Sequence, residues 1–510
     1  MATAAIELKN ITKTFGSVVA NKDVCLTVNR GEILSILGEN GSGKTTLMNM
    51  IAGIYFPDHG SIYINGEEAT IRSPKDAFDY KIGMIHQHFK LVDVFTAAEN
   101  IVLGLKEESG FNMKKSAEKI RNISHQYGFE IDPNKKIYEM SVSEKQTVEI
   151  IKVLYRGADI LILDEPTAVL TPQETDKLFA VLSRMRDDGK AIIIITHKMH
   201  EVLQLSDRVS VLRKGEYVGT VMTKDTTEAQ LTEMMVGQKV SLNIDRTDPM
   251  NPEDRLEVKN ISCTSREGVK LLKDVSFTAR SGEILGIAGI AGSGQRELLE
   301  AIAGLQHLES GEILYHNPKT GKTDNLRDKT PIQIRSLGVR LSFVPEDRLG
   351  MGLVGNMDII DNMMLRSYRK GKSVFLERKD PRDLAQKIID QLQVVTPDAH
   401  TPVRRLSGGN VQKVLVGREI AASPTVLMVA YPARGLDINS SYLIYNLLNE
   451  QKEKGVAVIF VGEDLDVLME LCDRIMVIGS GRITGTVNAR IAKKDEIGLL
   501  MTIGGDEDEA

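Results

Sequence analysis

Short aliphatic runs alternate with longer amphipathic stretches along the whole chain. Glu32–Leu37, Ile160–Leu163 and Ala191–Ile195 are aliphatic runs bounded by polar turns, a pattern that predicts buried strands. Thr45–Ala52 follows the first of these runs with the spacing of a helix. Strands that alternate with helical stretches are typical of α/β domains. The hydrophobic pattern therefore predicts an α/β fold whose strands are buried.

The same pattern occurs twice along the 510 residues, a length that itself favours two or more domains. A repeat this long indicates a duplicated domain. We expect a first domain over 1–240, a linker over 241–256, a second domain over 257–505 and a solvated acidic tail over 506–510. The repeated features are Gly31-Glu32-Ile33-Leu34 with Gly282-Glu283-Ile284-Leu285, Asn100 with Asn362, and Asp207-Arg208 with Asp473-Arg474.

Two polar segments and one loop-like segment complete this organisation. Phe111–Met140 is rich in lysine and has helical spacing, and Pro381–Val395 looks equivalent, which predicts a small helical subdomain in each half. Gln238–Arg255 is rich in Asp, Asn and Pro, as expected of a linker between domains.

Composition and charge exclude several classes of protein. The net charge of −6 provides no general basic field, so nucleic acid is a poor candidate partner. The three cysteines are scattered without metal or redox spacing and are typical of a reduced, cytoplasmic protein. No aliphatic run is long enough to cross a bilayer, so we expect no direct membrane insertion and only a peripheral membrane role.

The most informative segment follows the first predicted strand. Gly38-Glu39-Asn40-Gly41-Ser42-Gly43-Lys44-Thr45 matches G-x-x-x-x-G-K-[ST] at every fixed position. In such a loop the backbone N–H groups cradle phosphates, the lysine reaches the β- and γ-phosphates, and the Thr hydroxyl helps to hold Mg²⁺. The residues expected to contact the nucleotide here are Gly38, Asn40, Gly41, Gly43, Lys44, Thr45 and Thr46.

A second loop, Gly289–Arg296, keeps the glycines of this pattern and loses both functional side chains. Gln295 and Arg296 stand where Lys44 and Thr45 stand in the first half. We expect this loop to keep its shape without supporting hydrolysis. Two interpretations stay open for it: a glycine turn retained for packing, and weak binding of nucleotide without hydrolysis.

Further candidate residues follow the buried strands of the first half. Asp164 and Glu165 end one strand and point differently, so that Asp164 can serve Mg²⁺ while Glu165 polarises the attacking water. His197 follows another strand, where it could contact the γ-phosphate, and Gln87 could sense the metal and the water. Phe15 could stack an adenine ring, although a core phenylalanine would have the same signature. His86 and His88 flank Gln87 without a carboxylate or cysteine cluster and are best interpreted as surface loop residues.

These motifs, in this order, resemble an ATP-binding subunit of an ABC transporter, in the tandem form with two nucleotide-binding domains on one chain. The resemblance covers essentially the whole sequence and implies two P-loop NTPase domains of ABC type that associate head to tail. It implies that Gln87 is the Q-loop residue, Glu165 the catalytic carboxylate and His197 the switch histidine. It also implies that each ATP lies between the P-loop of one domain and the LSGGQ signature of the other.

The departures from the family pattern divide between the two composite sites. Leu406-Ser407-Gly408-Gly409-Asn410 is a nearly regular signature, whereas the first half has Met140-Ser141-Val142-Ser143-Glu144, which lacks both glycines. In the second half the residues at the motif positions are Ala430-Tyr431, Glu463 and Glu346. Head-to-tail pairing would therefore create one intact site, in which Ser407, Gly408, Gly409 and Asn410 complete the first P-loop, and one site with every motif replaced.

Three functions fit an ABC protein of this kind. The first is the ATPase subunit of an importer at the cytoplasmic face of the cell membrane, working with two permease subunits and an extracytoplasmic binding lipoprotein. The second is a soluble tandem ATPase that acts on ribosomes or DNA, and the third is a scaffold that only binds ATP. HQHFKLVDVFTAAENIVLG and DEPTAVLTPQE resemble the simple-sugar and nucleoside importers, and most closely the nucleoside branch, which also includes flavin uptake systems. The resemblance favours nucleoside import, with sugar or riboflavin as alternatives.

Overall fold

The computed structural model divides the chain into two compact units, Met1–Ser241 and Leu242–Ala510, and each is described by itself. The predicted boundaries of the domains and the linker are not tested by this division and stay predictions. The structure describes residues 4–502 except for 17, 87–88, 106–111, 169, 197, 238–243, 245, 266–267, 291, 344–348, 350–351, 366, 369–375, 422, 435 and 463.

Unit 1 is built on a ten-stranded sheet in the order β5-β4-β1-β2-β10-β9-β3-β8-β7-β6. Strands β6, β7, β8, β3 and β9 run parallel, and every residue of β3, β7 and β8 is buried, as the aliphatic runs predicted. The strands are β1 (Ala4–Phe15), β2 (Val18–Asn29), β3 (Ile33–Leu37), β4 (His59–Ile64), β5 (Glu67–Ala69), β6 (Ile82–Ile85), β7 (Ile160–Asp164), β8 (Ala191–Ile195), β9 (Arg208–Arg213) and β10 (Glu216–Met222).

The helices of unit 1 follow these strands, and several begin at side-chain caps. Thr96, Ser141 and Thr171 each accept a hydrogen bond from the backbone N–H three residues on, which starts α3, α5 and α6. The helices are α1 (Lys44–Ile51), α2 (Pro74–Asp79), α3 (Ala97–Val102), α4 (Met113–Tyr127), α5 (Val142–Tyr155), α6 (Pro172–Asp187), α7 (Met199–Leu205) and α8 (Glu228–Val236), with short 3₁₀ turns η1 (Ile137–Glu139) and η2 (Thr223–Asp225).

Unit 2 repeats the strand order of unit 1, which confirms the predicted duplication. Its six-stranded sheet runs β16-β17-β18-β13-β19-β20, and its four-stranded sheet runs β12-β11-β14-β15. The strands are β11 (Asp254–Thr264), β12 (Lys270–Arg280), β13 (Ile284–Ala288), β14 (Ser310–His316), β15 (Thr323–Asn325), β16 (Val339–Phe343), β17 (Val426–Ala430), β18 (Ala457–Val461), β19 (Arg474–Gly479) and β20 (Arg482–Asn488).

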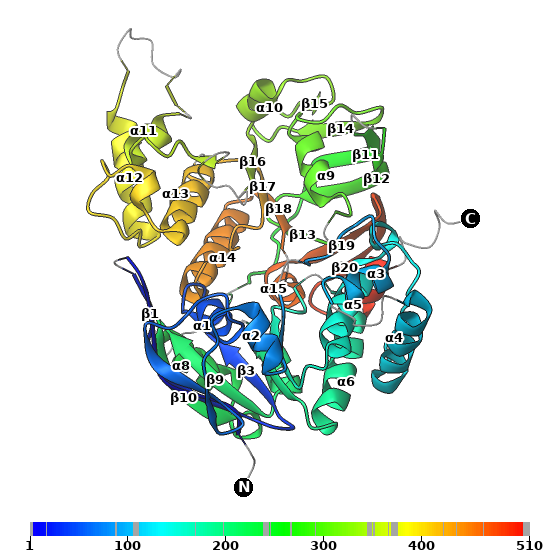
Figure 1. Ribbon diagram of the computed structural model, residues 1–510. Helices are drawn as coiled ribbons and strands as arrows, with labels where there is room; N and C mark the ends of the chain where they lie inside the picture. The colour runs from blue at the N-terminus through cyan, green and yellow to red at the C-terminus, as the bar shows by residue number, and fades with distance from the viewer. Residues whose placement is uncertain are drawn as a thin grey trace. The chain divides into compact units, whose positions relative to one another are not determined.

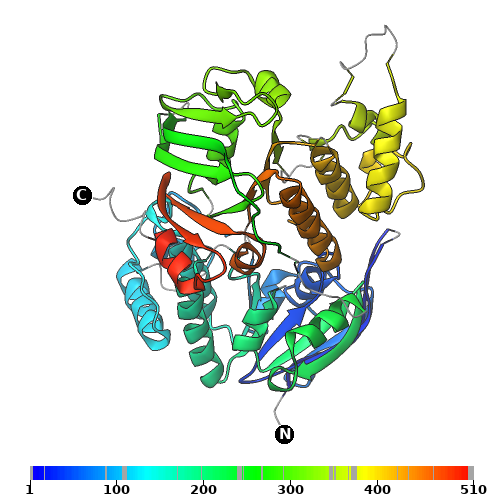
Figure 2. The same cartoon turned by 180° about the vertical axis from the view of Figure 1, so that it is seen from behind.

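The helices of unit 2 form two groups. Figures 1 and 2 show α11, α12 and α13 together in yellow at one end of this unit, with the green four-stranded sheet and α9 at the other. The yellow group contains the predicted helical segment Pro381–Val395, and α3, α4 and α5 form the matching group in unit 1. The helices are α9 (Gln295–Ile302), α10 (Pro331–Leu337), α11 (Ile359–Met364), α12 (Lys379–Gln391), α13 (Gly408–Ile420), α14 (Ile438–Glu453), α15 (Leu465–Leu471) and α16 (Lys494–Thr502), with η4 at Val403–Arg405.

The residues whose repetition indicated the duplication contact one another within each unit. Asp207 Oδ2 accepts the amide of Ile33 at 2.8 Å, and Arg208 Nη1 lies 3.2 Å from Glu32 Oε1. These contacts hold the start of β9 against the start of β3, the strand that leads into the phosphate loop. In unit 2 the same contacts join Asp473 to Ile284 and Arg474 to Glu283.

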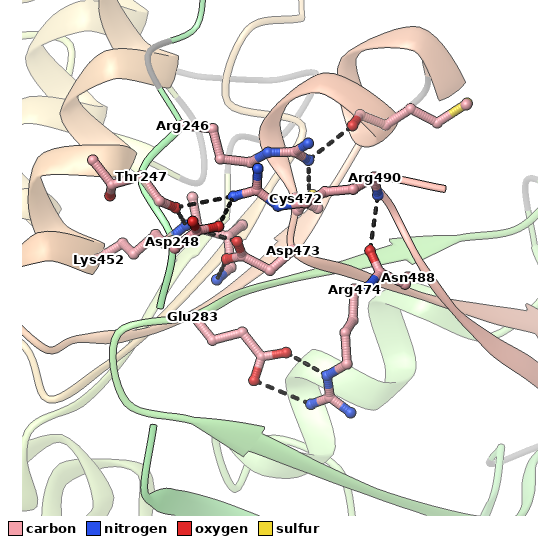
Figure 3. Close-up of polar contacts among 12 residues, drawn as sticks. Arg246, Thr247, Asp248, Glu283, Lys452, Cys472, Asp473, Arg474, Asn488 and Arg490 are labelled. Carbon is pink, nitrogen blue, oxygen red and sulfur yellow. Dashed lines mark hydrogen bonds and ion pairs between the residues drawn. The ribbon is translucent and has the colours of Figure 1, made fainter. Parts of the chain in front are cut away.

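Part of the predicted linker is bound to unit 2. Ile244 is 5% exposed and packs in the core of that unit. Arg246 donates to the carbonyl oxygens of Met469 and Cys472, and Lys452 donates to the carbonyl of Thr247 (Figure 3). Ile244, Arg246 and Thr247 therefore attach this part of the predicted linker to unit 2, and β11 begins shortly afterwards at Asp254.

The remaining sequence expectations concern the membrane and the tail. None of the helices in the described part of the chain combines the length and apolar character that a bilayer span requires. The predicted acidic tail, 506–510, lies outside the described residues.

Candidate nucleotide-binding site

The loop between β3 and α1 has a backbone that only glycine fits at three predicted positions. A Cβ on Gly38 would lie 2.3 Å from the carbonyl oxygen of Leu212, and a Cβ on Gly43 would lie 2.3 Å from that of Ala20. Gly41 and Gly43 have φ of 82° and 95°, in the left-handed region that other residues rarely adopt. The loop ends at the N-terminus of α1, where unpaired backbone N–H groups favour an anion.

Lys44 is the first residue of α1 and curls back over this loop. Its Nζ donates to the carbonyl oxygens of Gly38 at 2.6 Å and Glu39 at 3.0 Å, and the residue is 6% exposed. Burial lowers the pKa of the Lys44 ammonium, while the nearby charges of Glu165, Asp164 and Glu39 act in the opposite direction. Among the described residues, the hydrogen-bond acceptors of this ammonium group are backbone carbonyls, and these can be exchanged for phosphate oxygens.

Asp164 lies at the end of β7 and is 8% exposed. Burial and the charge of Glu165 raise the pKa of the Asp164 carboxyl to about 6, against the opposing effects of a hydrogen bond with Thr45 and the charge of Lys44. A cation here would relieve the cost of two neighbouring carboxylates, and the Thr45 hydroxyl with the Asp164 carboxylate is an oxygen ligand set of the kind that Mg²⁺ prefers. These residues fit the magnesium ion that the sequence predicted.

Glu165 differs from Asp164 for a reason that the sequence did not reveal. We expected the two side chains to diverge because they alternate along one strand, but β7 ends at Asp164. Glu165 has a φ of 47°, and its amide donates to the carbonyl of Ile195 at 2.9 Å. A left-handed turn, rather than strand alternation, therefore separates the two carboxylates.

Of the three remaining candidate residues of the first site, Phe15 is described by the structure, whereas Gln87 and His197 are not. Phe15 is 43% exposed at the end of β1 and makes an edge contact with Tyr55 at 5.1 Å between ring centroids, so it is not a core residue. Its role in stacking adenine stays a prediction. Gln87 and His197 lie outside the described residues.

In the described part of the second loop, Gln295 and Arg296 replace the side chains of Lys44 and Thr45. Gln295 is 4% exposed, and its Nε2 donates to the carbonyl of Ile290 at 3.0 Å, much as Lys44 bonds to its own loop. Arg296 pairs with Glu300 one helical turn on, with 2.7 Å between Nε and Oε1. Tyr431 has a φ of 52°, close to that of Glu165, so the backbone of the carboxylate turn is also retained. Unit 2 thus has neither the lysine nor the two carboxylates at these positions; Glu346 and Glu463 lie outside the described residues.

The two signature segments cap their helices in different ways. Ser407 accepts from the backbone N–H of Asn410 to start α13, and Gly408 and Gly409 form the first turn without side chains. Asn410 Nδ2 donates to Ser407 Oγ at 2.9 Å, and Asn410 Oδ1 accepts the amide of Val395 at 3.0 Å. The first turn of α13 is thus open to an anion.

In unit 1 the equivalent helix start already holds a carboxylate. The amide of Ser141 donates to Glu144 Oε2 at 2.7 Å, and Lys135 Nζ lies 2.8 Å from Glu144 Oε1. This capping box satisfies the start of α5 and places a negative charge where a phosphate would bind. The S-x-x-E spacing of Ser141 and Glu144 is the sequence signal for this capping box.

Two further polar groups near the first loop escaped sequence analysis. The Ser42 hydroxyl and the side-chain oxygen of Asn21 are buried and have no hydrogen-bond partner among the described residues, and the side-chain nitrogen of Asn21 donates to the carbonyl of Gly43. Ser42 lies inside the phosphate loop, so an incoming phosphate would supply an acceptor for its hydroxyl. No sequence pattern distinguishes Asn21 from any other polar residue of a strand.

Comparison with known proteins agrees with this geometry. The family model for the ABC transporter matches residues 21–168 and 272–432. The chain is 42% identical to the guanosine import ATP-binding protein NupO of Bacillus subtilis, over 99% of this chain and 98% of that one. It is 40% identical to the nucleoside import ATP-binding protein NupA of Lactococcus lactis, over 99% of each.

Two other matches complete the comparison. The glucose import ATP-binding protein TsgD13 of Haloferax volcanii is 40% identical over 98% of this chain and 96% of that one. The structure of an archaeal ribosome recycling factor, aABCE1, in complex with the ribosomal stalk protein aP1, matches with a TM-score of 0.60 at 16% identity, over 94% of this chain and 90% of that one. At this identity the likeness concerns the fold alone.

Proposed function

The chain belongs to the ABC transporter family, and from this premise we propose that it is the ATP-hydrolysing subunit of an importer of a small polar solute. The observation that carries this proposal is the match, over nearly the full length, to ATP-binding proteins of import systems. The buried Lys44, the Thr45–Asp164 pair and the exposed Phe15 supply the parts that binding and hydrolysis of magnesium ATP require.

Within this proposal a nucleoside is the first candidate for the imported solute. Two of the relatives are named for guanosine and nucleoside import, and one for glucose import, which keeps sugar as the alternative beside riboflavin. The test is reconstitution of the membrane subunits and binding protein that copurify with this chain. We expect nucleosides, presented with the binding protein, to stimulate ATP hydrolysis; stimulation by sugars or riboflavin alone would replace nucleoside by those solutes.

The proposed mechanism assigns a role to each residue of the first site. Lys44 exchanges the carbonyls of Gly38 and Glu39 for the β- and γ-phosphates, and Phe15 stacks the adenine. Mg²⁺, held by Thr45 and Asp164 with Gln87, would neutralise charge on the phosphates. Glu165 polarises the attacking water, and His197 contacts the γ-phosphate.

The signature of unit 2 completes this site in the proposed head-to-tail arrangement. Ser407, Gly408, Gly409 and Asn410 start α13, where the backbone N–H groups of Gly408 and Gly409 would face the γ-phosphate, whereas Glu144 closes the start of α5 in unit 1. Every loss in the chain then falls in the other composite site. This partition supports hydrolysis at one site per chain.

We also propose permease subunits and a binding lipoprotein as partners, and the cytoplasmic face of the membrane as the location. The permeases would dock on the segments near the two Q-loop positions, roughly 87–100 and 346–362. In the first segment Val92 is 37% and Val94 is 65% exposed, and Leu103 shortly after it is 47% exposed. The buried Asn100 holds this segment through hydrogen bonds with the amide and carbonyl of Val92. In unit 2 Asn362 makes the same bonds with Val354, and the exposed apolar residues are Val354, Met357 and Leu365. Such patches are typical of protein contacts.

The runner-up, a soluble ATPase acting on ribosomes or DNA, has less support. The likeness to aABCE1 at 16% identity concerns the fold and carries no argument about the ribosome. Copurification of the chain with ribosomes, and not with membrane proteins, would favour this second function.

A further inference from the structure

A buried polar cluster adjoins the turn that carries Glu165. Thr167 Oγ1 donates to Glu201 Oε2 at 2.6 Å, and Lys198 Nζ donates to the Thr167 carbonyl at 3.1 Å. Lys198 Nζ also lies 3.1 Å from Glu201 Oε1, which closes the group. We call Thr167, Lys198 and Glu201 the Thr167 triad. Thr167 is 2% exposed and Glu201 is 6% exposed, so both are removed from solvent.

The triad joins two segments that each follow a buried strand. Thr167 is the third residue after the end of β7, and Lys198 is the third after the end of β8, where it caps α7. Because both the hydroxyl and the carbonyl of Thr167 are engaged, the turn from Glu165 to Thr167 is fixed to the first turn of α7. Glu165 is held on its other side by the hydrogen bond that its backbone amide donates to the carbonyl of Ile195.

Unit 2 shows that the fold does not need these three residues. The third residue after β17 is Ala433, and the third and sixth residues after β18 are Asp464 and Val467. All three triad positions are therefore changed in the unit that has lost its carboxylate, although β17, β18 and α15 are retained.

Other contacts of the same turn are retained in both units, which separates them from the triad. Gln146 Nε2 donates to the carbonyl of Pro166 at 2.7 Å, and Gln412 makes the same bond to Pro432 in unit 2. The left-handed residue is also kept, as Glu165 and as Tyr431. The scaffold of the turn is thus common to both units, while the triad is restricted to unit 1.

The free-energy cost of burying charged groups also argues against a purely stabilising role for the Thr167 triad. A buried glutamate costs free energy even when paired, and apolar replacements of buried ion pairs are often neutral or stabilising. Val467 shows such a replacement within this chain. A buried cluster whose hydroxyl and carboxylate are replaced by Ala433 and Val467 in unit 2, and which is kept only beside the turn of Glu165, is explained by positioning better than by stability.

We propose that the Thr167 triad positions Glu165 for hydrolysis, by fixing the backbone of its turn to α7. Its members are positioning residues, because they act through Glu165 and contact neither phosphate nor water in this scheme. The inference rests on the proposed role of Glu165. Lys198 also directly follows His197 in the chain, so the same bonds connect the two segments that supply both candidate residues.

The test compares Thr167→Val, Thr167→Ser and Glu201→Val in the purified full-length chain, with Val467→Thr as the matched control in unit 2. We expect Thr167→Val and Glu201→Val to lower kcat by about 10- to 100-fold, because small misplacements of a reacting group cost this much. The KM for ATP should change less than about twofold, since the phosphate loop is untouched. Thr167→Ser should retain most of kcat, and Val467→Thr should leave it unchanged.

Three outcomes would overturn the inference. One is an unchanged kcat in both triad variants, and another is a raised KM at constant kcat. The third is a loss of activity that matches a loss of ATP-binding chains, with normal turnover per bound ATP, which would indicate a purely structural role. Glu165→Gln is measured alongside. If this variant retains hydrolysis, the proposed role of Glu165 fails. If it loses hydrolysis while the triad variants stay active, only the proposed role of the triad fails.

Discussion

Lys452 Nζ lies 2.7 Å from Asp473 Oδ1 in unit 2, and the Lys452 side chain is only 1% exposed. The same ammonium donates to the carbonyl of Thr247, so the predicted linker contacts the pair (Figure 3). The equivalent pair of unit 1, Arg186 and Asp207, is 3.4 Å apart with side chains 28% and 37% exposed. A duplicated ion pair is therefore buried in one unit and partly exposed in the other.

This difference predicts unequal effects of removing the cation. Lys452→Met should destabilise unit 2 by about 3 kcal/mol, because Asp473 would stay buried without its partner. Arg186→Met should cost about 1 kcal/mol or less, since solvent screens the exposed pair. Differential scanning calorimetry of both variants measures the effect, and equal shifts of the unfolding transitions would contradict the energetic difference expected from the unequal burial of the two pairs.

The first phosphate loop predicts a separation of binding from turnover. Lys44→Ala should abolish productive ATP binding, because its ammonium is the buried cation of the loop. Glu165→Gln should keep ATP binding and lower turnover roughly a hundredfold or more, as expected on losing a water-polarising group. Equilibrium binding and steady-state hydrolysis are measured on the same preparations. Near-normal hydrolysis by Glu165→Gln would refute the assignment of the catalytic carboxylate.

The environment of Asp164 predicts a dependence of stability on pH. Its pKa is raised from 3.8 to about 6, so between these values the folded chain keeps a proton that the unfolded chain has released. The contribution of this group to stability therefore falls as pH rises through that window and is constant above it. Asp164→Asn removes the effect and should stabilise the nucleotide-free chain by about 1–3 kcal/mol at pH 8.

Thermal unfolding of both proteins from pH 4.5 to 8 checks this sign. The gain in stability of Asp164→Asn over the unsubstituted chain should grow up to about pH 6 and then level off. The other carboxylates contribute equally to both proteins and therefore cancel when their stabilities are subtracted. The variant should also lose hydrolysis with Mg²⁺, since an amide is a weaker ligand than a carboxylate. An advantage that is independent of pH would show that Asp164 is ionised throughout.

The two helix starts predict unequal effects of a new carboxylate. Gly408→Asp places a side chain and a negative charge in the first turn of α13. In the proposed head-to-tail arrangement this charge would face the γ-phosphate of the ATP held by the first loop, so the variant should abolish turnover. Ser143→Asp adds a charge to a helix start that already carries Glu144 and should be much milder. The two variants are compared by their steady-state rates of ATP hydrolysis and by the number of nucleotides bound per chain.

A second pair of variants serves as the control for this comparison. Gln295→Ala should cost little where Lys44→Ala costs nearly all activity, because Gln295 bonds only to its own loop among the described contacts. An equal loss of ATP hydrolysis in Gly408→Asp and Ser143→Asp would contradict the proposal that only one composite site hydrolyses ATP.

Local patterns in the sequence determined much of this protein. Aliphatic runs identified β3, β7 and β8, because a strand buried on both faces has apolar residues at every position. The glycines at 38, 41 and 43 indicated the phosphate loop, since a positive φ or a close backbone approach excludes other residues. Repetition of Glu32 and Arg208 as Glu283 and Arg474 indicated the duplication, and these residues pair in both units.

Tertiary structure alone decided the features that depend on distant residues. Thr167 and Glu201 are 34 positions apart and Thr247 and Lys452 are 205 apart, so no local periodicity connects them. The linker composition predicted only a loop, and it was packing of Ile244 and the bonds of Arg246 that fixed it to unit 2. The left-handed backbone of Glu165 likewise goes with a hydrogen bond from its amide to the carbonyl of Ile195, the last residue of β8. Periodicity reports which face of an element is buried, whereas the partner of a buried polar group is set by how elements far apart in the chain come together.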